Sequence, residues 1–170
     1  MIPEFEEHIS VLSKEDCEWI KSLCTDFKPS EVVYNDDKGT RTINKKFRSS
    51  KTCFVNLSKE DEMKLLSKLE FLGINSLPSI KNEIQLLEYN EGDFFDKHKD
   101  GVKRYKTLLI QLSGESDYLG GELYVEDLLA SKKQGSVVLF NSDTSHQLNV
   151  VTWGRRYVLV VWLLKENFNL

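Results

Sequence analysis

Cysteine, histidine and proline are scarce in this sequence, with three residues of each among 170. The three cysteines, Cys17, Cys24 and Cys53, are an odd number without metal-ligand spacing. This argues against a disulfide framework and favours a reducing compartment. Because there are only three histidines, few residues could supply an imidazole ligand to a metal.

Long apolar runs and excess positive charge are also missing. The longest wholly apolar run, residues 157–164, suits a buried strand and falls far short of the roughly 20 residues of a spanning helix. The first ten residues lack the basic and apolar regions of a secretory signal, so we expect a cytoplasmic protein without a membrane segment. A net charge of -4 and a pI near 5.5 make nucleic acid a poor candidate partner.

The composition is that of an ordinary globular protein. Hydrophobic residues make up 40% of the chain and charged residues 29%, and 170 residues are enough for one domain with a proper core. We expect a single domain over residues 1–170, with a helical N-terminal part to about residue 80 and a β-rich core over about 83–165.

Two segments of the N-terminal part carry the signals of a capped helix. Residues 11–23 offer Ser13 as N-cap with Asp16 three residues later, and residues 56–73 repeat this pattern. Both segments are therefore predicted to be helices that pack on a flat surface. The apolar residues at helical spacing are Trp19, Ile20, Leu23, Met63, Leu66 and Leu69.

Between these helices lies a polar segment, residues 34–51. It could be a solvated loop or a mobile flap that covers a site, and we consider it a candidate lid. Its basic residues favour an acidic substrate. They include Arg41, Lys45, Lys46, Arg48 and Lys51.

From residue 83 onward, short β-like runs are separated by glycine-containing turns. Several strands at close spacing, with no long helix between them, argue for antiparallel pairing in a sandwich or barrel. We therefore expect a mainly β fold with flanking helices (α+β) around a jelly-roll core. The expected strands lie in residues 84–89, 105–112, 121–127, 135–140, 146–151 and 155–164.

Two of the histidines lie at expected strand edges: His98, with Asp100 two residues on, and His146. Residues i and i+2 of an extended chain project from the same side, so His98 and Asp100 can face one metal while His146 comes from a distant strand. Two imidazoles and one carboxylate hold Fe(II) and leave positions open for a chelating co-substrate and dioxygen. Each residue alone is more often a plain surface or hydrogen-bonded group, and a zinc hydrolase would use the same three.

Two arginines open the apolar strand expected at residues 155–164. A buried guanidinium is costly unless it meets an anion, and its fork matches a carboxylate. Strand alternation puts Arg155 and Arg156 on opposite faces, so only one of them can point inward and bind an acidic small molecule. The alternative is that both flank the strand at the surface.

The β-rich half contains five stretches that together resemble the catalytic domain of iron- and 2-oxoglutarate-dependent dioxygenases, in particular the prolyl 4-hydroxylase-like group. The likeness runs from about Ile84 to Trp162, and residues 11–23 look like the N-terminal helix of that group. It implies a double-stranded β-helix, the jelly-roll core. The stretches are LLEYNEGDFFDKHKDG, RYKTLLIQLS, LGGELYV, GSVVLFNSDTSHQL and VTWGRRYVLVVW.

The resemblance assigns roles to residues of this sequence. It implies that His98, Asp100 and His146 hold Fe(II) and that Arg156 binds the far carboxylate of 2-oxoglutarate. Tyr89 matches a tyrosine that helps to hold the co-substrate in similar enzymes. The implied cofactors are Fe(II), 2-oxoglutarate and O2, with ascorbate as reductant.

The implied reaction is hydroxylation of an unactivated C–H bond, with a peptidyl proline as the substrate typical of the group. Gln111 and Phe95 stand where some members of the group have tyrosine, and these changes to the expected pocket walls leave the substrate open. It could be a peptide or protein side chain, a free amino acid or a small metabolite. A jelly-roll domain that binds metal or ligand without turnover is the alternative of a different class. Oligomeric state has no signal in the sequence.

Overall fold

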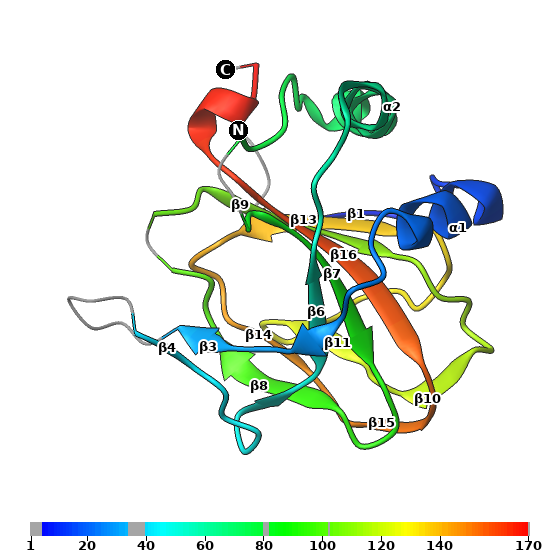
Figure 1. Cartoon of the computed structure of the whole chain (residues 1–170), viewed down its shortest axis with the longest axis vertical. Helices are drawn as coiled ribbons and strands as arrows, with labels where there is room; N and C mark the ends of the chain where they lie inside the picture. Colours follow the sequence, from blue (N-terminus) through cyan, green and yellow to red (C-terminus); the bar gives the residue numbers. More distant parts are fainter. Residues whose placement is uncertain (1–4, 34–39, 80–81, 102, 170) are drawn as a thin grey trace.

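A large antiparallel sheet forms the scaffold of the computed structural model, which describes residues 5–33, 40–79, 82–101 and 103–169 (Figure 1). Its strands are β1 (Phe5–His8), β2 (Lys28–Pro29), β6 (Lys51–Phe54), β7 (Ile84–Tyr89), β9 (Lys106–Gln111), β13 (Val137–Asn141) and β16 (Arg156–Leu163). They lie in the order β1-β13-β9-β16-β7-β6-β2. Strands distant in the chain thus become neighbours.

A smaller sheet packs against this one. Its strands are β5 (Arg48–Ser49), β8 (Phe94–His98), β11 (Leu123–Val125), β12 (Leu128–Leu129) and β14 (His146–Leu148), in the order β12-β11-β14-β8-β5. Two strand pairs complete the fold, β10 (Tyr118–Gly120) with β15 (Val151–Gly154) and β3 (Val32–Val33) with β4 (Arg41–Thr42). The pairings are antiparallel, which confirms the prediction of a mainly β protein.

The two faces of the larger sheet bury different cores, because successive side chains of a strand point to opposite sides. On β16, Leu159 and Val161 belong to a core that the helices cover. Val158, Val160 and Trp162 belong to a second core shared with the smaller sheet. The space between the sheets is therefore lined from the same face of β16 that carries Arg156.

Helices α1 (Lys14–Ser22) and α2 (Lys59–Leu69) cover the outer face of the larger sheet (Figure 1). The Ser13 hydroxyl accepts a hydrogen bond from the Asp16 amide at 3.0 Å, as predicted from the sequence. The expected apolar face of α2 is partly wrong, because Met63 is 70% exposed and Leu65 is buried instead. Among the described residues, no helix is both long enough and apolar enough to cross a membrane.

The N-terminal part supplies strands as well as helices. It adds β1, β2 and β6 to the larger sheet and β5 to the smaller one. The strand β6 pairs with β7, so that Thr52 lies opposite Leu87. These short, polar strands lack the long apolar alternation that reveals a strand from sequence. They extend the sheets that surround the site.

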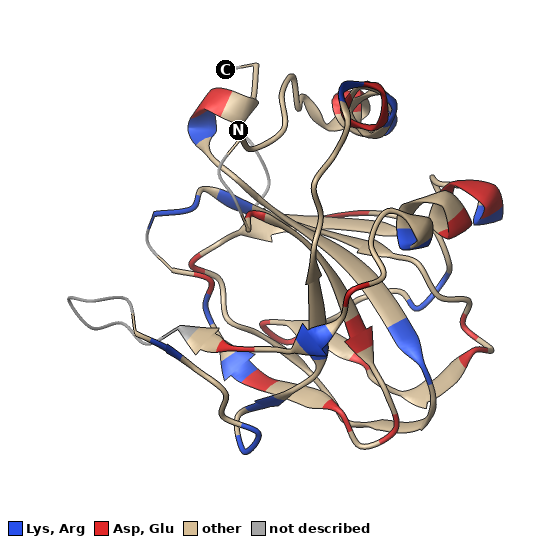
Figure 2. Ribbon diagram, in the orientation of Figure 1, with Lys and Arg blue, Asp and Glu red and all other residues tan. Residues whose placement is uncertain are grey.

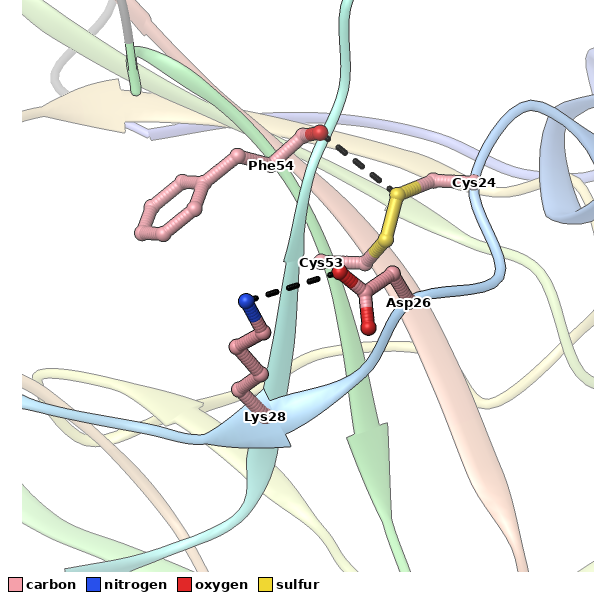
Figure 3. Close-up of a disulfide and its surroundings, with 5 residues drawn as sticks. All are labelled: Cys24, Asp26, Lys28, Cys53 and Phe54. Carbon is pink, nitrogen blue, oxygen red and sulfur yellow. Dashed lines mark hydrogen bonds and ion pairs between the residues drawn. A yellow bond between two sulfur atoms is a disulfide. The ribbon is translucent and has the colours of Figure 1, made fainter.

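A disulfide joins Cys24, just after α1, to Cys53 on β6 (Figure 3). The Cα atoms are 6.1 Å apart, and 29 positions separate the residues in sequence. Cys17 stays a free, buried thiol whose pKa burial raises to about 11. The expectation against disulfide bonding is therefore wrong for Cys24 and Cys53, and the cysteines no longer support a reducing compartment.

Replacing Cys53 by serine is expected to lower the free energy of unfolding. Closing a loop of this length restricts the unfolded chain and stabilises the fold by about 3 to 4 kcal/mol in the chain-entropy treatment. Urea denaturation of wild type and Cys53→Ser, both without reductant, measures the difference. Dithiothreitol should destabilise the wild type and leave Cys53→Ser unchanged. Equal midpoints for the two proteins without reductant would contradict the bond.

Candidate metal and co-substrate site

The three predicted metal ligands meet where β8 and β14 pair. His146 lies directly opposite His98 in this antiparallel ladder, and Asp100 follows two residues after His98. The potential ligand atoms of the three side chains all lie within 4.8 Å of one another. The pairing thus brings together residues that are 48 positions apart in the sequence.

Backbone contacts orient both imidazoles. The Nδ1 of His98 lies 2.7 Å from the Asp96 carbonyl oxygen, and the Nδ1 of His146 lies 3.0 Å from that of Thr144. A carbonyl oxygen only accepts, so each Nδ1 carries a proton and donates it. In the neutral ring the Nε2 lone pair is then free, and both Nε2 atoms face Asp100, at 3.6 Å from His98 and 3.3 Å from His146. This is how metal-binding histidines are usually arranged.

The Asp100 carboxylate is held by a second layer of hydrogen bonds. Thr107 on β9 donates its hydroxyl proton to Oδ2 of Asp100 at 2.7 Å, and its oxygen lies 3.0 Å from the Ser142 hydroxyl. The Asp100 amide also donates to the Ser142 carbonyl oxygen at 2.9 Å. The carboxylate therefore has a defined orientation. Thr107 was not predicted from the sequence, because only the β9 register brings it to the site.

The electrostatics suit a cation. Burial opposes ionisation of Asp100, but the contacts with His146 and His98 outweigh it and hold the pKa of Asp100 well below its usual value. Burial lowers the pKa of His98. Burial also acts to lower the pKa of His146, but the contact with Asp100 outweighs burial, so the pKa of His146 is raised. At neutral pH the site therefore offers an ionised carboxylate beside two imidazole rings.

Behind these side chains, Arg156 lines the same cavity. It is 4% exposed, and its Nε has no hydrogen-bond partner among the described residues. The indole Nε1 of Trp162, also on the cavity wall, lacks a partner in the same way. Buried donors are nearly always satisfied, so these two atoms fit an anionic ligand. Arg155 is exposed and donates to Asn90 Oδ1 at 2.7 Å, which confirms that only one arginine points inward.

Tyr89 completes the predicted set. It is 3% exposed, lies opposite Arg156 in the β7–β16 pairing and also lines the cavity. The guanidinium carbon of Arg156 lies 5.6 Å from the centre of its ring. The rest of the wall is largely apolar and includes Leu87, Leu109, Leu123, Val158 and Val160.

The segment considered as a lid contributes to this cavity in its described part. Residues 34–39 lie outside the described residues, and nothing follows for them. Further on, the Phe47 ring packs edge-on against Phe95 at 5.7 Å and against His98 at 6.3 Å. Arg48 is 8% exposed and forms part of the cavity wall. The sequence did not single out Arg48 from the other basic residues of its segment.

The two departures from the family pattern differ in their location. Phe95 lines the cavity, as expected for a change to the pocket wall. The Gln111 side chain is directed elsewhere: its amide donates to the Tyr118 hydroxyl at 2.9 Å and to the Ser113 carbonyl oxygen at 3.2 Å. Gln111 is therefore a structural residue rather than part of the described cavity wall, and that expectation is wrong.

Residues 84–164 match the family model described as the 2OG-Fe(II) oxygenase superfamily. A PKHD-type hydroxylase of Idiomarina loihiensis is 29% identical over 89 residues, which cover 47% of this chain and 41% of that protein. An uncharacterized protein of fowlpox virus is 28% identical over 167 residues, which cover 91% of this chain and 38% of the viral protein. The chain thus spans only about two fifths of the length of these curated relatives.

Among solved structures, a prolyl hydroxylase from Trichoplax adhaerens superposes with a TM-score of 0.70 at 17% identity. The superposition covers 96% of this chain and 84% of that one. This likeness confirms the jelly-roll fold. The family model matches residues 84–164, slightly less than half of the chain, so this part of the chain is similar to the 2OG-Fe(II) oxygenases.

We expect His146→Ala to weaken the binding of a divalent metal by more than about 100-fold, since loss of a direct ligand should exceed the 10- to 100-fold that loss of a supporting residue costs. Thr107→Val removes a supporting residue, so we expect it to weaken metal binding by about 10- to 100-fold. Calorimetric titration with Co(II) measures both. His8→Ala is the matched control, because His8 lies on β1 and contacts Glu6. Wild-type affinity in His146→Ala would rule out this metal site.

Proposed function

We propose that this chain is an Fe(II)- and 2-oxoglutarate-dependent dioxygenase that hydroxylates an unactivated C–H bond, with a peptidyl proline as the substrate. One observation carries the proposal. His98, Asp100 and His146 converge in a cavity whose wall also holds Arg156, a buried guanidinium with an unpartnered Nε. A metal-binding face and an anion-binding group in one cavity are what this reaction requires.

The donor set fits the two groups that the family implies. Two imidazoles and one carboxylate suit Fe(II) and leave positions open. In this proposal His98, Asp100 and His146 hold the metal. Arg156 binds the far carboxylate of 2-oxoglutarate, with Tyr89 beside it.

When bound, Fe(II) and 2-oxoglutarate supply the activation of O2 that hydroxylation needs, with ascorbate as the reductant that keeps the metal ferrous. The protein's own contribution is positional. Thr107 fixes the Asp100 carboxylate, and the backbone acceptors at Asp96 and Thr144 fix the imidazole tautomers. The apolar wall limits water in the cavity and strengthens the charge pairing of Arg156.

The relatives support a peptide substrate. The Trichoplax protein is a prolyl hydroxylase in complex with a peptide fragment of a hypoxia inducible factor, and the curated relatives include PKHD-type hydroxylases. A dioxygenase acting on a free amino acid or a small metabolite would use the same core residues. A zinc hydrolase fits the cavity less well, because the unpartnered donors of Arg156 and Trp162 would have no role.

Succinate formation from 2-oxoglutarate tests the reaction. With Fe(II), ascorbate and proline-containing peptides, we expect wild type to form succinate and His146→Ala to form none. Arg156→Met should raise the KM for 2-oxoglutarate by about 10- to 100-fold, the effect of losing a charge-assisted pair. The matched control is Arg155→Met, which removes the exposed neighbour.

Two results would contradict the proposal. The first is succinate formation that His146→Ala leaves unchanged, because the turnover would then not depend on this site. The second is tight binding of metal and 2-oxoglutarate by wild type without succinate, which would favour a binding domain without turnover.

A further inference from the structure

A second buried arginine, Arg48, faces the same cavity and has no role in the proposed reaction. It lies on β5, opposite Phe95 of β8, and is 8% exposed. Its Nε donates to the Ser50 hydroxyl and its Nη1 to the Glu31 carbonyl oxygen, both at 3.1 Å. Both acceptors are neutral. None of the ion pairs among the described residues includes Arg48.

Arg48 is close to the candidate metal ligands. Its guanidinium carbon lies 4.4 Å from the centre of the Phe95 ring, and the His98 ring stacks on the same Phe95 ring at 3.6 Å. Burial lowers the pKa of Arg48, and its neighbours Tyr89 and Asp100 partly offset this effect. The guanidinium is thus held near the reacting region and not at the outer surface.

The charges of the cavity leave Arg48 unbalanced. The titratable side chains on the wall, Tyr89 apart, are Arg48, His98, Asp100, His146 and Arg156. On the proposed function, Fe(II), ionised Asp100 and the 2-oxoglutarate dianion together carry one negative charge, which Arg156 balances when the imidazoles are neutral. Arg48 then adds one positive charge without a counterpart. A buried charge of this kind is costly unless an anion pairs with it.

We propose that Arg48 binds a carboxylate of the substrate, so that the enzyme selects substrates with a carboxylate close to the hydroxylated carbon. The inference rests on the proposed function for its charge balance. The carboxylate of the substrate could be a main-chain carboxylate, as in a C-terminal residue or a free amino acid. It could also be an acidic side chain next to the hydroxylated residue. The guanidinium fork suits either.

The surroundings agree with an anionic substrate. Figure 2 shows basic residues along β4 and the connection that leads to β5. Arg41, Lys45 and Lys46 are exposed there, on a chain whose net charge is -4. Phe47, between Lys46 and Arg48, packs against His98, so this basic segment leads directly to the cavity. Local positive charge raises the encounter rate with anions.

Binding to a non-reactive holoprotein tests the inference without turnover. Protein loaded with Co(II) and saturating 2-oxoglutarate is titrated in a calorimeter with matched pairs that differ only as carboxylate and carboxamide. One pair is N-acetylproline and its amide. The others are blocked tripeptides, Glu-Pro-Gly against Gln-Pro-Gly and Gly-Pro-Glu against Gly-Pro-Gln.

Wild type should bind the carboxylate member of at least one pair about 10- to 100-fold more tightly, as expected for a charge-assisted contact. Arg48→Met should abolish this preference and leave the affinities for Co(II) and 2-oxoglutarate within about twofold of wild type. Arg155→Met should keep the preference. Which pair responds identifies the source of the carboxylate.

The inference fails if wild type shows no carboxylate preference in any pair, or if Arg48→Met retains it. It also fails if Arg48→Met loses affinity for 2-oxoglutarate, because Arg48 would then serve the co-substrate. If Arg48→Met does not fold, Arg48→Gln replaces it, because glutamine keeps a donor for Ser50. We expect Arg48→Gln to lose the carboxylate preference as well and to keep the affinities for Co(II) and 2-oxoglutarate. A carboxylate preference without succinate formation would retain the binding site and reject the proposed reaction, so the two failures are distinguishable.

Discussion

The antiparallel pairing of β8 with β14 is the constraint on which the candidate site depends. It sets His146 opposite His98, and the two-residue period of the extended chain then brings Asp100 to the same point. The other edge of β8 pairs with β5, which places Arg48 opposite Phe95. A shift of this register by one residue would turn the histidines to opposite faces. The smaller sheet therefore positions both the candidate metal ligands and the second arginine.

The larger sheet performs a complementary task through β16. Its alternation divides the strand into a face that the helices cover and a face that lines the cavity, and Arg156 begins the second face. Packing of α1 and α2 on the outer face buries the apolar residues that hold this sheet in place. Burial of the Arg156 guanidinium is unfavourable, because its Nε finds no partner in the described residues, and the packing of the rest of the fold has to outweigh this cost. Such a tension between packing and polarity is typical of a binding site.

The sequence predicted the helix caps and six strands of the β-rich half because their signals are local: alternation, glycine-containing turns and a serine three residues before an aspartate. The six strands are β7, β9, β11, β13, β14 and β16, whereas β8, β10, β12 and β15 were not among the expected strands. The sequence also did not predict β5 or β6, which are short and polar, nor the bond between Cys24 and Cys53, which depends on how α1 and β6 pack. Met63 was assigned to the wrong face of α2 for a similar reason, since spacing alone does not say where the sheet lies. Arg48 resembled its basic neighbours until the pairing with β8 selected it.

The two arginines define different requirements for what enters the cavity. Before any ligand binds, Arg48 and Arg156 face a single ionised carboxylate, so the wall is net positive with neutral imidazoles. A divalent metal adds to this excess, whereas a dianionic co-substrate reduces it, so binding of the metal and of 2-oxoglutarate should reinforce each other electrostatically. After both are bound, the remaining positive charge belongs to Arg48, and a carboxylate on the substrate is the group that neutralises it. The same charge balance disfavours substrates with a cation beside the reacting carbon, because an additional like charge in a buried cavity is unfavourable.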